Sequence, residues 1–455
     1  MPEKRPAGHP ESAVDAAVVR VVSAWENSTH TLDFLLDREL GKSRLDPGRK
    51  AQVTERSANW ARGQGAVRWL LSQVLSRSPE SLPPPLRRLL EVTVARLLFE
   101  ERTPRALIVS QAVDQVKAEY GPQLGGLANA VLRKLASEPL PWPDPDQDPA
   151  GHLASVTSHP LWIIQRWLAR WGAERTRAQA DWDNQRPALW LRWNRLRGDL
   201  EAAAERLSQA QVEVEADPRF PGYFRLTGAF YPAAHELVQA GDFSVQDPSA
   251  SLAVRLLDPQ PGTAILDLCA APGGKTTLMA EWTGDRAGIM AVDLSRHRLK
   301  QLTAAVKRLG LMGVQTNAAD GREFARHCTG GNCFDAVLLD VPCSGFGVLQ
   351  RRADLRWRRR PEDLDHLVPL QKELIRAAAA CVKQGGSLVY STCSIEPEEN
   401  EDIVGDFLAG NADFALDVSP RGLPAELVAR PGEISTFSPR DRIDGVYAAR
   451  IIRRT

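Results

Sequence analysis

From about residue 242 to the C-terminus, short apolar runs alternate with stretches of helical periodicity. The apolar runs cover residues 264–268, 288–292, 335–339 and 387–390. Strands that alternate with helices are joined by right-handed crossovers, and this connection builds a parallel sheet with helices on both faces. The sequence therefore predicts a doubly wound α/β domain over residues 242–455. Residues 414–417 and 445–452 are expected to add a terminal antiparallel pair to its sheet.

The N-terminal part has a different periodicity. Apolar residues at Ala17, Val18, Val21 and Trp25 recur at intervals of three and four, which is the spacing of one face of a helix. The same spacing returns within residues 86–94, 109–116 and 127–135. We therefore expect an all-α domain over residues 12–138.

Two further segments separate these domains. Prolines crowd residues 139–145, and because proline disfavours helix, residues 139–157 are expected to form a linker. Strand patterns at residues 188–194, 212–214 and 223–226, with a helix capped by Asp199, predict a small α+β connecting domain over residues 158–241.

Composition limits the classes of protein. A chain of 455 residues exceeds the size at which a single core stops growing, so a multidomain fold is expected. The formal net charge of +0 gives no global attraction for nucleic acid, so any such binding must use local basic patches. The six cysteines resemble thiols of a reducing compartment, and no segment has the apolar length of a membrane span. We expect a cytoplasmic protein that does not bind membranes.

A loop of small residues follows the first strand of the α/β domain. It contains Cys269, Ala270, Ala271, Pro272, Gly273, Gly274 and Lys275. In doubly wound sheets, ligands bind at the carboxyl ends of the strands, and small residues let the backbone approach a nucleotide closely. A phosphate-binding P-loop is disfavoured because cysteine occupies the position of its first glycine, and the dinucleotide fingerprint of three glycines is absent. An S-adenosylmethionine site remains.

Two acids support that cofactor. Asp293 lies about 20 residues beyond the loop at the end of the second strand, where a carboxylate can accept the ribose hydroxyls. Asp320 follows the third strand-like run and is placed to bind the adenine amine. Either acid alone has a simpler explanation as a solvated residue at a strand end, but their shared position at successive strand ends favours the cofactor.

Two cysteines, Cys343 and Cys393, follow the fourth and fifth strand-like runs. Parallel strands bring such loops to the same edge of a sheet, so the two thiols are expected to share one pocket. A thiolate that adds to C6 of cytosine makes C5 nucleophilic, and this pattern therefore suggests carbon methylation of a base. Cys269 and Cys381 are interpreted as small buried apolar residues. Cys328 and Cys333 lack a second Cys/His pair, so no metal is expected.

The motifs resemble those of the RNA (cytosine-5)-methyltransferase family. They are the Asp-Leu-Cys-Ala-Ala-Pro-Gly-Gly-Lys loop at 267–275, Asp-Val-Pro-Cys-Ser-Gly at 340–345 and Tyr-Ser-Thr-Cys-Ser-Ile at 390–395, with Glu399, Asn400 and Glu401 behind the last. Residues 127–133 and 158–162 are similar to segments of bacterial 16S rRNA methyltransferases that carry a NusB-like domain. The resemblance implies a NusB-like RNA-binding domain, a connecting domain and a Rossmann-like catalytic domain.

The resemblance also implies roles for residues. Cys393 corresponds to the nucleophile, Cys343 to the residue that assists product release, and Asp340 to the acid that binds the base and borders the cofactor. DNA cytosine methyltransferases use a Pro-Cys nucleophile instead, so the Thr-Cys motif favours RNA, and no DNA partner is expected. The domain arrangement that the resemblance implies favours 16S rRNA. Methylation of tRNA or another RNA, and a non-catalytic RNA-binding or antitermination factor, remain alternatives.

An arginine-rich segment follows the Cys343 loop. Arg351, Arg352, Arg356, Arg358, Arg359 and Arg360 surround Trp357. Arginines with an aromatic residue are typical of contacts to RNA phosphates and bases. The alternative is a solvated, charged helix start before Pro361.

Overall fold

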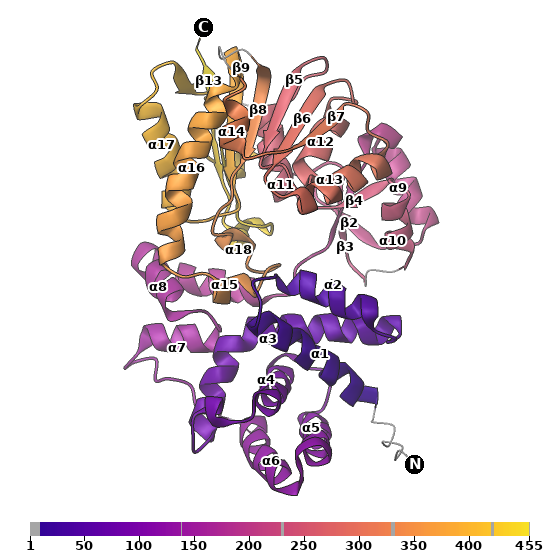
Figure 1. The fold of residues 1–455 in the computed structure, drawn as a ribbon, viewed down its shortest axis with the longest axis vertical. Helices are drawn as coiled ribbons and strands as arrows, with labels where there is room; N and C mark the ends of the chain where they lie inside the picture. Colours follow the sequence, from indigo (N-terminus) through magenta and orange to yellow (C-terminus); the bar gives the residue numbers. More distant parts are fainter. Residues whose placement is uncertain (1–9, 138, 229–231, 329–332, 420–422, 455) are drawn as a thin grey trace. The chain divides into compact units, whose positions relative to one another are not determined.

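The computed structural model describes residues 10–137, 139–228, 232–328, 333–419 and 423–454. The chain forms two compact units (Figure 1). Unit 1 contains Met1–Gln185 and Leu349–Arg359, and unit 2 contains Arg186–Val348 and Arg360–Thr455. None of the helices within the described ranges is long and apolar enough to cross a lipid bilayer.

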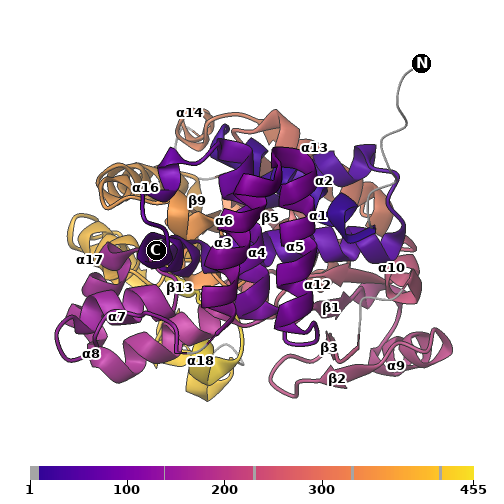
Figure 2. The same ribbon diagram turned by 90° about the horizontal axis from the view of Figure 1, so that it is seen from below.

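Unit 1 is helical. Its helices are α1 (Pro10–Glu26), α2 (Leu32–Lys42), α3 (Pro47–Val74), α4 (Pro84–Phe99), α5 (Arg105–Tyr120), α6 (Pro122–Ala136), α7 (Pro149–Val156), α8 (Leu161–Asn184) and α15 (Leu355–Arg358). The four periodic stretches of the sequence lie in α1, α4, α5 and α6, so the prediction of an all-α N-terminal domain is confirmed. Helices α4, α5 and α6 run side by side (Figure 2).

The core of unit 1 is apolar but contains a buried charge cluster. The indole rings of Trp25 and Trp60 meet edge to face at 5.4 Å. Beside this core, the carboxylate of Asp15 accepts from Arg56 and Arg96, each at 2.8 Å. Burial raises the pKa of Asp15 although both arginines oppose the shift. A buried acid of this kind is tolerated because both of its oxygens are paired.

Residues 139–148, the proline-rich part of the expected linker, are turns and extended chain, whereas α7 occupies much of the remainder. Asp148 caps α7 by accepting from the backbone N–H of Gly151. Helix α8 bends at Gly172, whose φ of +75° is left-handed. Although the sequence assigns α8 to the connecting domain, the helix packs in unit 1.

The segment Leu349–Arg359 packs in unit 1 although it is distant from the other residues of the unit in sequence. The Asp354 carboxylate accepts from the Trp25 indole at 3.1 Å and from the backbone N–H of Leu32, at the start of α2, at 3.0 Å. The indole of Trp357 donates to the carbonyl of Ala61 in α3 at 2.7 Å. The segment is therefore bonded to several helices of this unit.

Unit 2 begins with a small antiparallel sheet in the order β2-β3-β1-β4. Its strands are β1 (Trp190–Trp193), β2 (Val214–Ala216), β3 (Tyr223–Leu226) and β4 (Phe243–Val245), and its helices are α9 (Leu200–Gln209) and α10 (Pro232–Gln239). Asp199 caps α9 by accepting from the backbone N–H of Ala202, as predicted. Trp193 and Phe243 pack in its core with their rings 5.0 Å apart. The predicted α+β fold of this region is confirmed.

The rest of unit 2 is built on a nine-stranded sheet. Strands β5 (Ala264–Leu268), β6 (Gly288–Asp293), β7 (Val314–Ala318), β8 (Phe334–Asp340) and β9 (Val382–Thr392) pair in parallel, in the order β9-β8-β5-β6-β7. Beyond β9, antiparallel pairing adds β13 (Tyr447–Arg453), β10 (Phe414–Leu416), β12 (Glu433–Ser435) and β11 (Val428–Arg430). The predicted parallel sheet and terminal pair are confirmed, whereas β11 and β12 were not predicted.

Helices cover both faces of this sheet. They are α11 (Ser249–Leu257), α12 (Gly274–Trp282), α13 (Arg296–Leu309), α14 (Gly321–Ala325), α16 (Glu362–Ala380), α17 (Glu401–Ala409) and α18 (Ser438–Asp441). Helices α11 and α12 pack on the face that carries Ile265 and Leu338. Helices α14, α16 and α17 pack on the opposite face, with Leu266 and Leu339. This two-sided cover explains why the parallel strands read as continuous apolar runs.

Candidate active site

The two predicted cysteines meet at one edge of the large sheet. Cys343 follows β8 and Cys393 follows β9, and these neighbouring parallel strands place Asp340 opposite Ser391. The Sγ atoms of the two cysteines lie 3.2 Å apart. The structure therefore brings together two side chains that are 50 positions apart in sequence.

A buried carboxylate fastens both cysteine loops. Glu399, which is fully buried, accepts from the backbone N–H of Ser344 at 2.8 Å and from the hydroxyl groups of Ser344 and Ser394. The amide of Gln371 donates to the same carboxylate and to the carbonyl of Pro342. Each serine directly follows one of the cysteines, so Glu399 ties the two loops to each other. In the sequence, Glu399 appears only as a residue behind the Cys393 motif, with no role of its own, and the serine after each cysteine is the signal that could have pointed to its partners.

Burial and hydrogen bonding shape the protonation of the pair. The pKa of the Cys343 thiol lies well above its ordinary value, because a hydrogen bond with Cys393 and burial both favour the protonated form. The nearby charges of Glu399 and Asp340 act in the same direction. Cys343 is therefore held in its protonated form beside Cys393.

Lys275 and Asp340 form an ion pair at the same edge. Lys275 lies in the first turn of α12, and its Nζ is 2.6 Å from Oδ2 of Asp340, while the Ser391 hydroxyl donates to Oδ1 at 2.8 Å. Burial acts to lower the pKa of Lys275, but the attraction and hydrogen bond of Asp340 outweigh it and raise the pKa. A negative charge on Cys393 acts in the same direction as Asp340. The site thus keeps a positive charge beside its thiols.

The loop of small residues connects β5 to α12 at this edge. Cys269 and Gly273 both have left-handed φ values, +68° and +107°. The backbone N–H of Ala271 donates to Asp293, which also accepts from the backbone N–H of Ser295. Burial raises the pKa of the Cys269 thiol to about 12, so this cysteine is inert, as its sequence interpretation expects. The loop and Asp293 are therefore joined directly, across 22 positions of sequence.

Asp320 lies at the next strand end but is not bonded to the loop. It follows β7, caps α14 and accepts from the backbone N–H and guanidinium of Arg322. These bonds lower the pKa of Asp320. Because a carboxylate has about four acceptor sites, both Asp293 and Asp320 retain capacity for further donors. These two carboxylate acceptors therefore suit a ligand that donates from hydroxyl and amine groups.

Beneath the loop, Asp267 at the end of β5 is fully buried. It accepts from the Thr276 hydroxyl at 2.5 Å, while its Oδ1 has no hydrogen-bond partner among the described residues. Burial raises the pKa of Asp267 to about 7. The carboxyl thus titrates close to neutral pH within the floor of the site.

The predicted phosphate contacts of the arginine-rich segment are wrong for two of its arginines. Arg356 is fully buried in unit 1, where it donates to the side chain of Asn184 at 2.9 Å and the carbonyl of Asp183 at 3.1 Å. Arg358 stacks on Trp25 and donates to three carbonyls near the end of α1. The solvated alternative fails for the same residues, because their guanidinium groups satisfy backbone acceptors inside this unit.

Comparison with protein-family models matches the three parts of the chain. Residues 254–452 match the 16S rRNA methyltransferase RsmB/F family, residues 159–231 match the ferredoxin-like domain of RsmF/B-like methyltransferases, and residues 15–137 match the NusB family.

Individual proteins are similar over most of the chain. The ribosomal RNA small subunit methyltransferase B of Klebsiella pneumoniae subsp. pneumoniae is 34% identical over 444 residues, which cover 96% of each chain. A probable small subunit methyltransferase B of Bacillus subtilis is 29% identical over 96% of this chain and 97% of that one. The crystal structure of PH0851 matches with a TM-score of 0.80 at 27% identity, over 98% of this chain and 100% of that chain. With its NusB-like, ferredoxin-like and methyltransferase parts in this order, the chain belongs to the RsmB/F family of 16S rRNA methyltransferases.

Proposed function

We propose that this RNA methyltransferase transfers a methyl group to C5 of a cytosine, through a covalent bond between Cys393 and C6 of the base. The observation that carries the proposal is the 3.2 Å separation of the Cys343 and Cys393 sulfur atoms at the ends of adjacent strands. One thiol suffices to form the bond to the base. A second thiol at contact distance allows formation and release to be divided between two groups.

The first role is that of Cys393 as nucleophile. Its thiolate is favoured by the charge of Lys275 and by a hydrogen bond with the Cys343 thiol at 3.2 Å. Asp340 is held by Lys275 and Ser391, and in this position its carboxylate accepts from the exocyclic amine of the base, while a proton taken up by Asp340 would be donated to N3 as negative charge develops in the ring. The target base leaves its stack to reach these groups.

The second role is release. Addition of the Cys393 sulfur to C6 places an electron pair on C5, which accepts the methyl group. The C5 proton must then leave to a base while the bond between C6 and sulfur breaks and restores the ring. Cys343 lies beside the sulfur of the adduct and assists this elimination.

The methyl donor in this proposal is S-adenosylmethionine, which supplies an electrophilic methyl group. The loop from Cys269 to Lys275 would hold it, with Asp293 at its ribose, Asp320 at its adenine and Asp340 at the border with the base. The remaining acceptor capacity of both strand-end acids supports this assignment. The names of the relatives and of the matching family support 16S rRNA of the small subunit as the substrate. The cytosine target and a cytoplasmic location remain part of this proposal.

Labelled methyl transfer to protein-free 16S rRNA, followed by bisulfite sequencing, tests the proposal. Wild-type protein should create a bisulfite-resistant cytosine. Cys393→Ala should abolish both the modification and any covalent RNA adduct, whereas Cys343→Ala should let the adduct accumulate. Accumulation in Cys393→Ala instead would exchange the two roles, and methylation away from C5 would contradict the proposal.

A further inference from the structure

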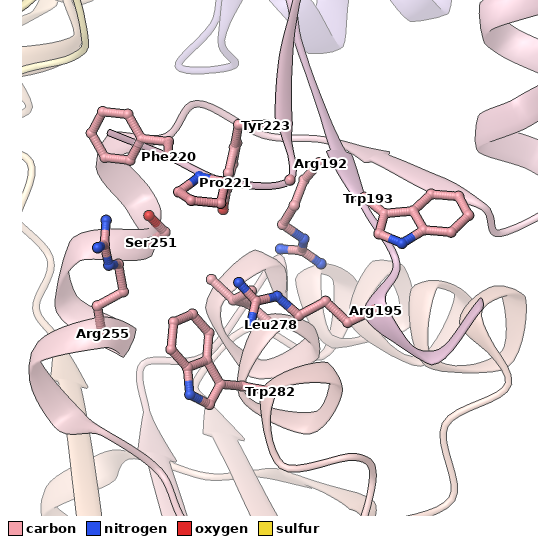
Figure 3. Close-up of a pocket in the computed structure, with 11 residues that line it drawn as sticks. Arg192, Trp193, Arg195, Phe220, Pro221, Tyr223, Ser251, Arg255, Leu278 and Trp282 are labelled. Atoms are coloured by element: carbon pink, nitrogen blue, oxygen red, sulfur yellow. The ribbon is translucent and has the colours of Figure 1, made fainter. Parts of the chain in front are cut away.

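Apart from the cysteine site, unit 2 contains a pocket where β1 and the turn before β3 meet α11 and α12 (Figure 3). It has a volume of about 100 Å³. Its lining residues are Arg192, Trp193, Arg195, Phe220, Pro221, Gly222, Tyr223, Ser251, Arg255, Leu278 and Trp282. None of them belongs to the loops that carry Cys343 and Cys393. Helix α12 nevertheless links the two places, because Lys275 lies near its start and Trp282 at its end, about 10 Å further along the axis.

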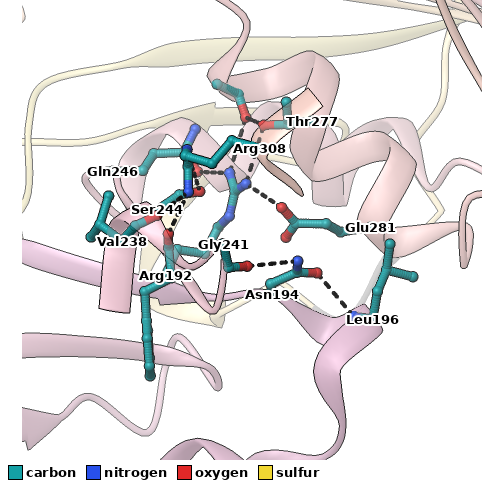
Figure 4. A network of polar contacts seen from close by, with 12 residues as sticks. Arg192, Asn194, Leu196, Val238, Gly241, Ser244, Gln246, Thr277, Glu281 and Arg308 are labelled. Carbon is teal, nitrogen blue, oxygen red and sulfur yellow. Dashed lines mark hydrogen bonds and ion pairs between the residues drawn. The ribbon is translucent and has the colours of Figure 1, made fainter. Parts of the chain in front are cut away.

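Charge in this pocket is one-sided, since three arginines and no carboxylate line it. Arg192 has a structural task (Figure 4): it donates to Glu281 at 2.7 Å, to the Thr277 hydroxyl at 3.2 Å and to the Gly274 carbonyl at 3.0 Å. These bonds fasten β1 to α12 and offset the charge of Arg192. Its Nε has no hydrogen-bond partner among the described residues. The side chain of Arg192 is therefore fixed by its hydrogen bonds and forms one wall of the pocket.

Two other arginines supply the net charge. The guanidinium of Arg195 lies 4.4 Å from the centre of the Trp282 ring, and its side chain is exposed. Arg255 donates to the carbonyl of Arg219 at 2.9 Å. The pKa of Arg255 is lowered, first by burial and then by repulsion from Arg195. The two cations thus oppose each other across the pocket, and an anion bound with them would relieve that repulsion.

Flat apolar faces complete the pocket. Phe220 and Tyr223 pack edge to face at 6.3 Å, and Trp282 is held by its contact with Arg195. The Tyr223 hydroxyl donates to Gln246 at 3.1 Å, which fixes its ring. Aromatic faces beside cations are the combination that binds unpaired nucleotides, because bases stack on the rings and phosphates meet the guanidinium groups.

We infer that this pocket binds one unpaired nucleotide of the RNA substrate, with its phosphate between Arg195 and Arg255 and its base against Trp282, which is half-buried. Phe220 and Tyr223 are buried and shape the pocket wall. The inference rests on the proposed function in one respect, because it takes RNA as the substrate of the same enzyme. It adds a contact remote from the target base. Such a contact fixes the register of the strand without touching the reacting atoms.

Binding of protein-free 16S rRNA and of a 12-nucleotide oligocytidylate, measured at several salt concentrations, tests the inference. Arg195→Ala with Arg255→Ala should weaken binding about tenfold and reduce the salt slope by about 1 to 2. The matched control is Arg326→Ala with Arg376→Ala, which removes two exposed arginines, one directly after α14 and one within α16, on the opposite face of the sheet. Wild-type affinity in the first variant, or an equal loss in the control, would overturn the inference.

Loss of the bond from Arg255 to Arg219 can loosen the fold, so Arg195→Glu is the second variant. Its side chain is exposed, and its reversed charge should weaken RNA binding at least as much while the thermal midpoint stays unchanged. Photo-crosslinking of 4-thiouridine RNA should label Trp282. Crosslinks confined to other residues, or cytidine monophosphate that competes at RNA-like affinity, would argue against an RNA site.

The same RNA separates this inference from the proposed function. If the wild-type protein methylates C5 of cytosine but the Arg195→Glu variant binds RNA with wild-type affinity, the pocket assignment is overturned and the proposed function stands. Wild-type protein that binds RNA through the pocket but makes no 5-methylcytosine would overturn the proposed chemistry alone.

Discussion

Glu399 accepts both the backbone N–H and the hydroxyl of Ser344, the residue next to Cys343. A further hydrogen bond, from the hydroxyl of Ser394, connects Glu399 to the loop of Cys393. One buried carboxylate therefore sets the distance between the two thiols. Glu399 is a positioning residue, because it acts on the sulfur atoms through the two serines.

Glu399→Gln should lower the rate of methyl transfer about 10- to 100-fold while the affinity for RNA stays unchanged. The amide would point a donor at groups that already donate, which misplaces both cysteine loops. Single-turnover rates and KM for RNA measure this separation. Asp402→Asn, at an exposed position in the first turn of α17, should change neither quantity. A loss confined to KM would contradict a positioning role.

Lys275→Met should slow formation of the covalent RNA adduct about 100-fold, since it removes the positive charge beside Cys393 and Asp340. Trapping the adduct in the Cys343→Ala background measures this step directly. Lys372→Met removes a lysine from an exposed ion pair with Asp406 and should leave the rate intact. Equal adduct rates with and without Lys275 would show that the thiolate does not depend on this charge.

Asp267→Asn should raise stability more at pH 8 than at pH 5. The folded-state pKa of about 7 exceeds the ordinary aspartate value of 3.8, so the native protein binds the proton more tightly than the unfolded chain between these values. The contribution of Asp267 to stability therefore falls as pH rises through this window, by about 3 kcal/mol between pH 5 and pH 8. Asparagine cannot titrate and removes that loss.

Urea midpoints of the wild type and the Asp267→Asn variant at both pH values check the sign. Asp335→Asn is the control, because the pKa of Asp335 is lowered and this acid is charged at pH 5 and at pH 8 in both states. Its effect should be the same at the two pH values. A pH-independent effect of Asp267→Asn would mean that this carboxyl stays ionised in the fold.

Arg356→Ala should destabilise the helical unit by about 3 kcal/mol, because it leaves the buried acceptors at Asp183 and Asn184 without a donor. Thermal unfolding measures the loss. Arg352→Ala, at an exposed position of the same segment, should leave the midpoint unchanged. If Arg356 instead contacted RNA phosphates, its replacement would lower the salt slope of RNA binding and spare the midpoint.

The bounds of a helix or strand could be predicted best where its buried residues follow one regular apolar pattern. The predicted ranges of β3 and β5 agree with the structure at both ends, since each strand is a short apolar run. Helix α3 escaped detection because it buries polar Arg56, Arg62 and Gln64 together with Trp60, so no single apolar face marks it. Strands β11 and β12 are three residues each, which is too short for a periodic signal.

The candidate site likewise contains residues that the sequence could predict and residues that it could not. The cysteines and the small-residue loop lie at strand ends, so the sheet topology predicts that they meet. The partners of Arg356 are about 170 positions distant, and nothing local distinguishes this buried arginine from an exposed one. Glu399 belongs to the motif behind Cys393, but its role could not be predicted because it depends on two serines that only the pairing of β8 with β9 brings together.

The segment Leu349–Arg359 begins six residues after Cys343 and belongs to unit 1, and the chain returns to unit 2 at Arg360. The polypeptide therefore crosses three times between its two folding units, at 185/186, 348/349 and 359/360. Neither unit can be separated by a single cut, because a fragment that ends at residue 185 lacks Asp354, which bonds to Trp25 and to the start of α2. A fragment that begins at residue 186 retains Arg356 and Arg358 but lacks the carbonyls to which they donate. The helical unit is thus completed only by residues from the middle of the methyltransferase sequence.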